Sequence, residues 1–322
     1  MKKFILLWAG IFLSVVFIPL LSGTSPEGAA DKKEAPPETA RNTSNEISVY
    51  MADSGKTETM TLRDYIIGAT GAEMPAAFEH DALCAQALCS LTLAVYYSGR
   101  PDNSAPGSAA ISTDPAVHQA YMSVKEMKKK WGGDFEKYYE KLCAATDEIL
   151  TYVITYDGEP IVAAFHAVSP GKTESAENVW KNAVPYLVSV DSAGDSFSPK
   201  FTSSLTVSAD EFSEKLGLSR MDEDTDIPGE TVYSDAGTLL SVKLGGKTFT
   251  GQQIREAFGL QSNAIKISSK DGEITFSVKG YGHGVGLSQY GADYYARQGM
   301  NWREIIAHYY PGTEITDRIE YG

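Results

Sequence analysis

The sequence predicts an α+β fold, with mixed, mostly antiparallel sheets, a core helical region and a smaller inserted α/β module. Apolar, helix-like segments dominate residues 62–97, and short strand-like runs replace them from Ile149 onward. Residues 204–279 then alternate helix and strand patterns of their own before a glycine-rich run begins. We therefore predict a core built from residues 47–203 plus 280–322, interrupted by an inserted subdomain at 204–279.

The N-terminal sequence predicts that the protein is exported from the cytoplasm. Lys2 and Lys3 precede an uncharged apolar run from Phe4 to about Leu21, which is long enough to cross a bilayer. The lysines would stay on the cytoplasmic side and place the rest of the chain outside the cytoplasm. Residues 1–22 are thus predicted to be a single-pass transmembrane anchor of a cell-membrane protein. A cleaved signal peptide is the alternative, although no clean Ala-x-Ala site follows.

Residues 23–46 are rich in Pro, Glu, Lys, Ala and Thr, which predicts a disordered linker. The first half of the core is then predicted to contain both strands and helices. In order, we expect a strand at Ile47–Met51, a polar strand leading to Thr61, helices at Leu62–Thr70 and Asp81–Tyr97, a loop at 98–111 and a helical region at 115–146 interrupted near Gly132.

The second half favours hairpins. Two alternating apolar runs, at 150–156 and 160–167, flank Asp157-Gly158 and predict a β-hairpin. In the insertion we expect helices at 209–216 and 252–258, an acidic turn-rich stretch at 222–230, and strands at 238–244, 247–250, 264–268 and 274–278.

Charge and cysteine content exclude several functions. The formal charge of −14 includes no basic stripe, so nucleic acid is not an expected partner. Cys84, Cys89 and Cys143 are odd in number and form no C-x-x-C pair, so neither a disulfide framework nor a zinc ribbon is indicated. We interpret them as small buried hydrophobic residues, with pairing of Cys143 to either of the others left open.

The first candidate site is the segment Gly71–Ala76. Its Glu73 lies between a glycine-containing turn and Pro75, near apolar Met74 and Phe78. Partial burial would raise the pKa of this carboxyl and suit it to general acid catalysis. A glutamate in the first turn of a helix is, however, also a common stabilising feature.

Two further segments are rich in polar side chains and turns. Residues 164–180 follow a strand and combine His, Ser, Thr, Glu, Asn and Trp, as loops lining a ligand cleft do. The alternative is a capped loop, in which Thr173 and Glu174 begin a helix and Trp180 fills the core. Residues 280–292 hold four glycines in seven positions, which lets the backbone approach a neighbour closely. This run fits no phosphate-binding loop, and a simple strand-to-helix connection is its alternative.

The three segments together resemble the stage II sporulation protein D family. The resemblance covers most of the chain from about Ile47, and residues 302–312 continue it. Its motifs are Glu-Met-Pro before Ala-Leu-x-Ala-Gln-Ala, His-x-x-Ser-x-Gly-x-Thr-Glu-Ser-Ala-x-x-Val-Trp, and Gly-Tyr-Gly-His-Gly-Val-Gly-x-Ser-Gln-Tyr-Gly-Ala.

The resemblance implies a lytic transglycosylase that cleaves peptide-stripped peptidoglycan glycan strands during engulfment in sporulation. It implies that Glu73 is the catalytic acid, that no metal or organic cofactor is needed, and that the protein works in a membrane complex with a scaffold protein and an amidase/endopeptidase. Two alternatives stay open: a wall-binding amidase enhancer without catalysis, and a hydrolytic muramidase using Glu174 or Glu177 as second carboxylate. The candidate substrate-binding residues are His166, Ser169, Thr173, Glu174, Tyr281, His283, Ser288 and Gln289.

Three departures from the family pattern concern activity. Where relatives usually read Ala-Arg-Thr-Tyr, this chain has Ser90-Leu91-Thr92-Leu93, and Pro170 replaces a common glycine. Some relatives carry a His/Cys metal site in the segment corresponding to 98–119, where this chain has His118 but no cysteine. We therefore predict no zinc in that segment.

Overall fold

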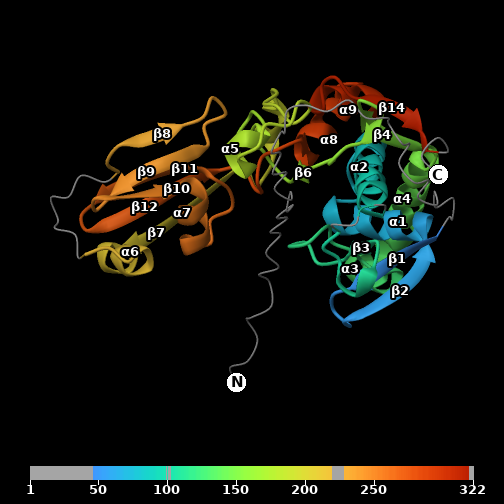
Figure 1. The fold of residues 1–322 in the computed structure, drawn as a ribbon, viewed down its shortest axis with the longest axis horizontal. Coiled ribbons are helices and arrows are strands. Elements are labelled where there is room, and N and C mark those ends of the chain that lie inside the picture. The colour runs from blue at the N-terminus through green and yellow to red at the C-terminus, as the bar shows by residue number, and fades with distance from the viewer. Residues whose placement is uncertain (1–45, 99, 101–102, 220–227, 319–322) are drawn as a thin grey trace, which may run out of the picture.

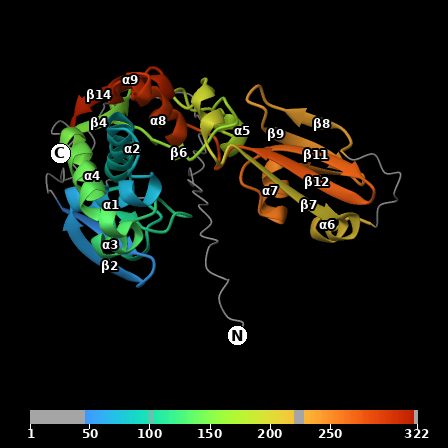
Figure 2. The same cartoon turned by 180° about the vertical axis from the view of Figure 1, so that it is seen from behind.

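The computed structural model describes residues 46–98, 100, 103–219 and 228–318. It has two lobes, seen from opposite sides in Figures 1 and 2, and the chain connects them near α5 and β6. The predicted mixed α+β class is confirmed, since most of the small sheets are antiparallel and lie beside a group of helices.

The larger lobe contains both ends of the described chain. Its elements are β1 (Glu46–Met51), β2 (Lys56–Thr61), α1 (Leu62–Glu73), α2 (His80–Ser98), β3 (Ile111–Ser112), α3 (Val124–Trp131), α4 (Phe135–Ile149), β4 (Tyr152–Tyr156), β5 (Glu159–Pro160), β6 (Phe165–His166), α5 (Ala176–Trp180), β13 (Leu287–Ser288), α8 (Gln289–Arg297), α9 (Trp302–Tyr309) and β14 (Glu314–Asp317).

Helix α2 is the centre of the larger lobe. It is apolar on every side, and it packs against α1, α4, α8 and α9 as well as β4. A helix that is hydrophobic all round has to be buried, so the other helices assemble around it. The predicted central role of this helix is confirmed, and Cys84 and Cys89 are buried in it as free thiols.

The described residues of the smaller lobe form two three-stranded antiparallel sheets and two helices. Its elements are β7 (Thr202–Ser208), α6 (Ala209–Leu216), β8 (Thr231–Tyr233), β9 (Leu239–Leu244), β10 (Lys247–Thr250), α7 (Gly251–Phe258), β11 (Ala264–Lys270) and β12 (Glu273–Lys279). Its buried apolar residues, from Val207 to Val278, form a cluster separate from that of the larger lobe. This separation supports our proposal of an inserted subdomain at 204–279.

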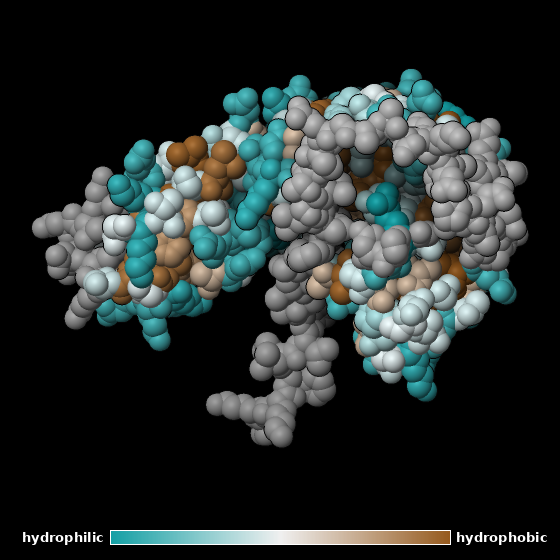
Figure 3. Space-filling model, viewed as in Figure 1, coloured by the Kyte–Doolittle hydropathy of each residue, from teal (hydrophilic) through white to brown (hydrophobic). Residues whose placement is uncertain are grey.

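The outer surface of the smaller lobe is largely hydrophilic in Figure 3, with apolar side chains gathered beside β8. Val232 and Tyr233 on this strand are exposed large hydrophobic residues. The grey atoms in this view belong to residues outside the described ranges.

Backbone pairing joins the two parts of the larger lobe that precede and follow the smaller lobe in sequence. Strand β6 pairs in parallel with β13, and Val168 and Tyr281 exchange backbone hydrogen bonds of 3.1 and 2.7 Å. Gly280, Gly282, Gly284 and Gly286 all have positive φ, a conformation that costs glycine little. The close approach predicted for the glycine run is thus made to residues 164–174 of the same chain.

Several predicted elements differ in extent. Helix α1 continues past Thr70 to Glu73, and residues 115–123 are not helical, because α3 begins only after its Ser123 cap. Strands β7 and β8 were missed, while the hairpin around Asp157-Gly158 is confirmed as β4 and β5. The predicted strand at 160–167 is reduced to its two ends.

The predicted anchor and linker lie outside the described residues. Within the described ranges, none of the helices is long and apolar enough to cross a membrane.

Substituting Gly286 by alanine should strongly destabilise the protein. An added Cβ would lie 2.0 Å from the carbonyl oxygen of Ala164, in addition to the strain of a residue at φ +71°. We expect a loss of more than about 2 kcal/mol in the free energy of unfolding, measured by denaturant titration. Gly299→Ala is the control: its φ is +94° but its Cβ would meet open space, so it should cost less. Equal losses in both variants would contradict the close approach.

Candidate active site

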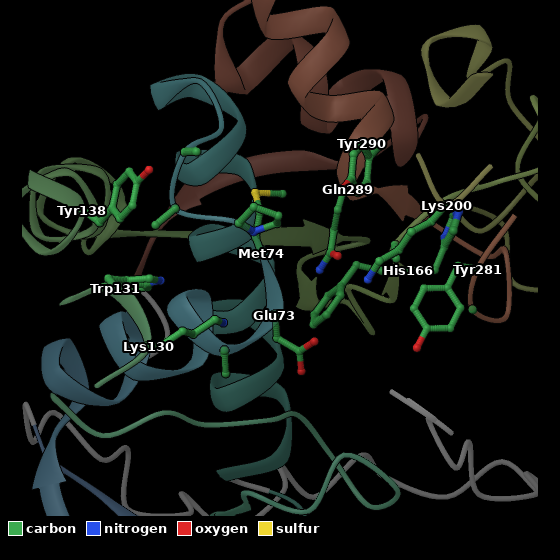
Figure 4. A pocket seen from close by; sticks show the side chains of 17 residues that line it. Glu73, Met74, Lys130, Trp131, Tyr138, His166, Lys200, Tyr281, Gln289 and Tyr290 are labelled. Atoms are coloured by element: carbon green, nitrogen blue, oxygen red, sulfur yellow. The ribbon is translucent and has the colours of Figure 1, made fainter. Parts of the chain in front are cut away.

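A pocket of about 300 Å³ opens in the larger lobe beside the end of α1. It is lined by residues 72–77, by Lys130 and Trp131 of α3, by Tyr138 of α4, by residues 165–167, and by Lys200, Tyr281, Gly282, Gln289 and Tyr290. Five separate stretches of sequence therefore meet here, at 72–77, 130–138, 165–167, 200 and 281–290, and they include the three segments that the sequence singled out (Figure 4).

Glu73 is the last residue of α1. Met74 leaves the helical conformation with φ −120° and ψ 144°, because it precedes Pro75, which disfavours the α region for the residue before it. The predicted break is therefore confirmed, but Glu73 ends the first helix instead of beginning the second. The C-terminal end of a helix carries partial negative charge, which disfavours an ionised carboxyl there.

The environment of Glu73 lets a substantial fraction of it stay protonated near neutral pH. Burial raises the pKa of this carboxyl from its ordinary value of 4.5 to about 7, although a backbone hydrogen bond from Ala120 opposes the shift. The Ala120 N–H donates to Glu73 Oε1 at 2.7 Å. Only 9% of the residue is exposed, yet it lines the pocket, so it could transfer a proton there.

A glycine in α1 brings Ala120 into position. A Cβ on Gly68 would lie 2.1 Å from the ring of Tyr121, so the ring occupies the space that a side chain would fill. Tyr121 also stacks on Tyr65, and the Met122 N–H donates to the Gly68 carbonyl at 3.1 Å. These contacts hold the non-helical segment 119–122 along α1, where its backbone reaches Glu73.

His166 lines the pocket opposite α3. Its Nδ1 lies 3.1 Å from the Val285 carbonyl oxygen, to which it donates when the ring is neutral. Burial lowers the pKa of His166 to about 4, so the ring is neutral at pH 7. Its Nε2 then carries a lone pair and has no hydrogen-bond partner among the described residues. This atom can accept a hydrogen bond, but the ring cannot serve as an acid.

Polar groups surround the Glu73 carboxyl on both sides. Figure 4 shows Lys130 and Trp131 on one side, and Gln289, Lys200 and Tyr281 on the other. The Gln289 amide donates to Gln86 Oε1 at 3.1 Å, which anchors its side chain to α2. A ligand in this pocket would meet two cationic groups and several aromatic rings.

Ser169 and Ser288 are gathered around a buried aspartate instead of the pocket. Asp195 accepts a 2.6 Å hydrogen bond from the Ser288 hydroxyl and a 2.9 Å bond from the Ser169 N–H. Burial raises the pKa of Asp195, and the hydrogen bonds from both serines counteract this. Asp195 thereby ties the 166–171 loop to the start of α8.

The other three candidates are also held away from the pocket. Glu174 accepts from the Ser175 N–H, the Asn178 amide and the Ser234 hydroxyl, so it connects the larger lobe to the smaller one. The Thr173 hydroxyl accepts from the Val190 N–H at 2.9 Å. His283 Nδ1 accepts from the Val285 N–H, and burial holds its pKa well below the usual range. A sugar-binding role for these residues stays a prediction.

Sequence reasoning missed part of the pocket wall. The missed side chains are those of Lys130, Trp131, Tyr138, Lys200 and Tyr290. Tyr290 directly follows Gln289 in the third segment, so the motif already contained it. The lysines and the α3 and α4 aromatics lie in ordinary helix or loop sequence that gives no local signal.

The departures from the family pattern lie outside the pocket. Leu91, which stands where an arginine is usual, is fully buried in α2. His118 is buried, its Nδ1 accepts from the Ser112 N–H at 2.9 Å, and burial lowers its pKa to about 4. Its contacts are those of a structural histidine.

Comparison with known proteins gives consistent matches. A family model described as "Stage II sporulation protein" matches residues 50–156. The chain is 34% identical to stage II sporulation protein D of Bacillus amyloliquefaciens, covering 98% of this chain and 96% of the relative. It is 35% identical to the protein of that name from Bacillus subtilis (strain 168), over 87% and 81%.

A more distant relative bears a different name. The amidase enhancer of Bacillus subtilis (strain 168) is 25% identical over 76% of this chain and 39% of the relative. The near full-length matches and the family model agree, and this chain belongs to the stage II sporulation protein D family.

Proposed function

We propose that this protein is a peptidoglycan lytic transglycosylase of sporulation that cleaves the bond between N-acetylmuramic acid and N-acetylglucosamine. The observation that carries the proposal is a single buried carboxyl group, Glu73, whose pKa is raised to about 7 and which faces a pocket. Family membership supports a role in sporulation, and the pocket chemistry supports the reaction.

In the proposed reaction Glu73 acts twice. Its proton passes to the glycosidic oxygen as the bond from that oxygen to the muramic acid C1 breaks. The resulting carboxylate then takes the proton of the same sugar's C6 hydroxyl as O6 bonds to C1. The products are a 1,6-anhydromuramic end and a free N-acetylglucosamine hydroxyl, and no water is consumed.

The absence of a second pocket carboxyl favours this route over hydrolysis. Among the described residues that line the pocket, Glu73 carries the only carboxyl group. Hydrolytic glycosidases ordinarily need a second carboxylate to activate water or attack the sugar. Glu174 is committed to three hydrogen bonds elsewhere, and Glu177 does not line the pocket.

Lys130 and Lys200 suit a substrate without peptide stems. Removing a stem peptide leaves a carboxylate on the lactyl group of muramic acid, and an ammonium group is its natural partner. Burial lowers the pKa of Lys130, and the nearby charge of Lys200 lowers it further, so an anion between them would be favourable. We therefore propose that the two lysines bind this carboxylate.

The proposal includes an exported protein anchored in the cell membrane, acting with a scaffold protein and an amidase/endopeptidase that removes the stem peptides. The amidase enhancer among its relatives supports a setting in the cell wall. A non-catalytic enhancer is the competing function, and the product analysis below distinguishes the two.

Glu73→Gln should reduce strand cleavage by about 10²–10⁴-fold, because glutamine cannot donate the proton. Peptide-free glycan strands would be incubated with each protein and the ends analysed by mass spectrometry. Wild-type protein should yield anhydromuramic ends, as should the control Glu177→Gln. Reducing ends would indicate hydrolysis instead, and intact strands with wild-type protein would favour the enhancer.

Cleavage should decline as the pH rises above about 7, because only protonated Glu73 can act as the acid. The dependence of kcat/KM on pH should approach a tenfold loss for each further unit. A rate that increases from pH 7 to 9 would contradict the assignment.

Protein stability provides an independent check on this pKa. A carboxyl whose pKa is raised on folding stabilises the fold below its unfolded value of about 4.5, and this advantage disappears as the pH rises through about 7. Glu73→Gln does not titrate, so at pH 8 it should be more stable than wild type by up to about 3 kcal/mol. Equal stability would indicate that Glu73 is not strongly desolvated.

Replacing both Lys130 and Lys200 by methionine should raise KM for peptide-free strands about tenfold, with a smaller change in kcat. Strands that retain their peptides lack the free carboxylate, so they should show little difference between the two proteins. Lys129→Met, at a neighbouring exposed lysine outside the pocket, is the control. An unchanged KM for peptide-free strands would exclude the proposed carboxylate contact.

A further inference from the structure

Three side chains of types that can ligate a metal ion meet at the surface between α2 and α4, outside the pocket. His80 Nε2 lies 2.8 Å from Glu148 Oε2 and 3.4 Å from Cys84 Sγ. The three ligand atoms all lie within 4.8 Å of one another. None of these residues lines the pocket, so the proposed glycan chemistry does not account for the cluster.

Helix geometry explains how the cluster forms. His80 and Cys84 are four residues apart on α2, which places them one above the other on the same face. Helix α4 packs against that face, and Cys84 Sγ contacts the Ala145 carbonyl at 3.8 Å. Glu148 is less than one turn further along α4 and reaches back over the thiol.

The carboxylate is oriented by a group that is not itself a candidate ligand. The Trp302 indole N–H donates to Glu148 Oε1 at 2.7 Å, which leaves Oε2 facing His80. Trp302 is 4% exposed, and its backbone N–H donates to Asp81 Oδ1 at 2.9 Å. Metal-binding carboxylates are commonly fixed by such second hydrogen bonds, so the arrangement is typical of a prepared ligand.

The donor set and spacing fit a borderline transition metal. Sulfur, imidazole nitrogen and carboxylate oxygen together suit Zn²⁺, and tetrahedral bonds of its usual length separate ligand atoms by roughly 3.3–3.8 Å. The sulfur-to-nitrogen distance of 3.4 Å already agrees. The nitrogen-to-oxygen distance would have to open by about half an ångström, which two partly exposed side chains permit.

We propose that His80, Cys84 and Glu148 form a site for one Zn²⁺ ion, with water at the fourth position. The side chains of His80 and Glu148 are 41% and 47% exposed, so an ion can enter from solvent while Cys84 forms the floor. Bound zinc would connect the start of α2 to the end of α4. This departs from our prediction from the resemblance, which expected no metal cofactor.

Charge in the cluster is compatible with a cation. In the absence of metal, burial raises the pKa of the Cys84 thiol, and the negative charges of Glu148 and Asp81 raise it further. A divalent ion would reverse this balance, since it stabilises the thiolate and is attracted by the same carboxylates. The alternative occupant is a proton, which would leave a simple His80–Glu148 ion pair beside a neutral thiol.

Cobalt titration distinguishes the two states. The full chain would be purified in detergent with a chelator and a non-binding reductant, and then titrated with Co²⁺ alone. We expect one equivalent to produce tetrahedral visible bands and a near-ultraviolet thiolate-to-cobalt band, both displaced by Zn²⁺. Zn²⁺ should also raise the thermal unfolding midpoint.

Two variants and a matched control make the assignment specific. Cys84→Ser should lose the thiolate band, and both it and His80→Asn should bind about 100-fold more weakly or worse. Cys143→Ser changes a cysteine of α4 outside the cluster, so it should keep the band. Circular dichroism would confirm that each variant is folded. No band in wild type, or a band lost in Cys143→Ser and kept in Cys84→Ser, would overturn the proposal.

Discussion

The larger lobe depends on the backbone pairing between residues 164–174 and 280–287. These segments are separated in sequence by the whole smaller lobe, so the chain has to return to the larger lobe before its core can close. Positions 280 and 286 have no room for a side chain, because Gly280 and Gly286 lie against the backbone of residues 164–170. The same pairing places Tyr281 and Gln289 in the wall of the pocket, so the pocket forms as the two segments pair.

Glu73, the proposed catalytic acid, is buried at a cost to the stability of the folded state. Its protonated form is favoured by burial, and the segment that buries it is positioned by Tyr121 lying over Gly68. At neutral pH and above, the folded state loses free energy through this residue, because the unfolded chain would ionise it freely. Proteins accept such local losses where the chemistry needs a shifted pKa.

Polar residues near a site need not contact the ligand. The contacts of Asp195 with Ser169 and Ser288 position loops. The contacts of Glu174 with Asn178 and Ser234 position the two lobes. Buried polar groups need partners, so a loop rich in Ser, Thr and Glu can be specified entirely by its own packing. The proposed zinc site was likewise not indicated by the sequence: His80 and Glu148 lie outside the motifs, and Cys84 occupies the unspecified position of Ala-Leu-x-Ala-Gln-Ala.

The sequence alone determined the α+β class, the central α2, the membership in the family and the position of Glu73 before Pro75, because these depend on local periodicity, turn chemistry and contiguous motifs. It misplaced Glu73 relative to its helix, since Gly71 and Ala72 can continue α1 once neighbouring segments pack on it. Only the tertiary structure decided which polar residues face the pocket, and that Lys130, Trp131 and Lys200 join Glu73 there. Such contacts join residues far apart in the chain, and no local pattern records which distant side chain will occupy the space beside another.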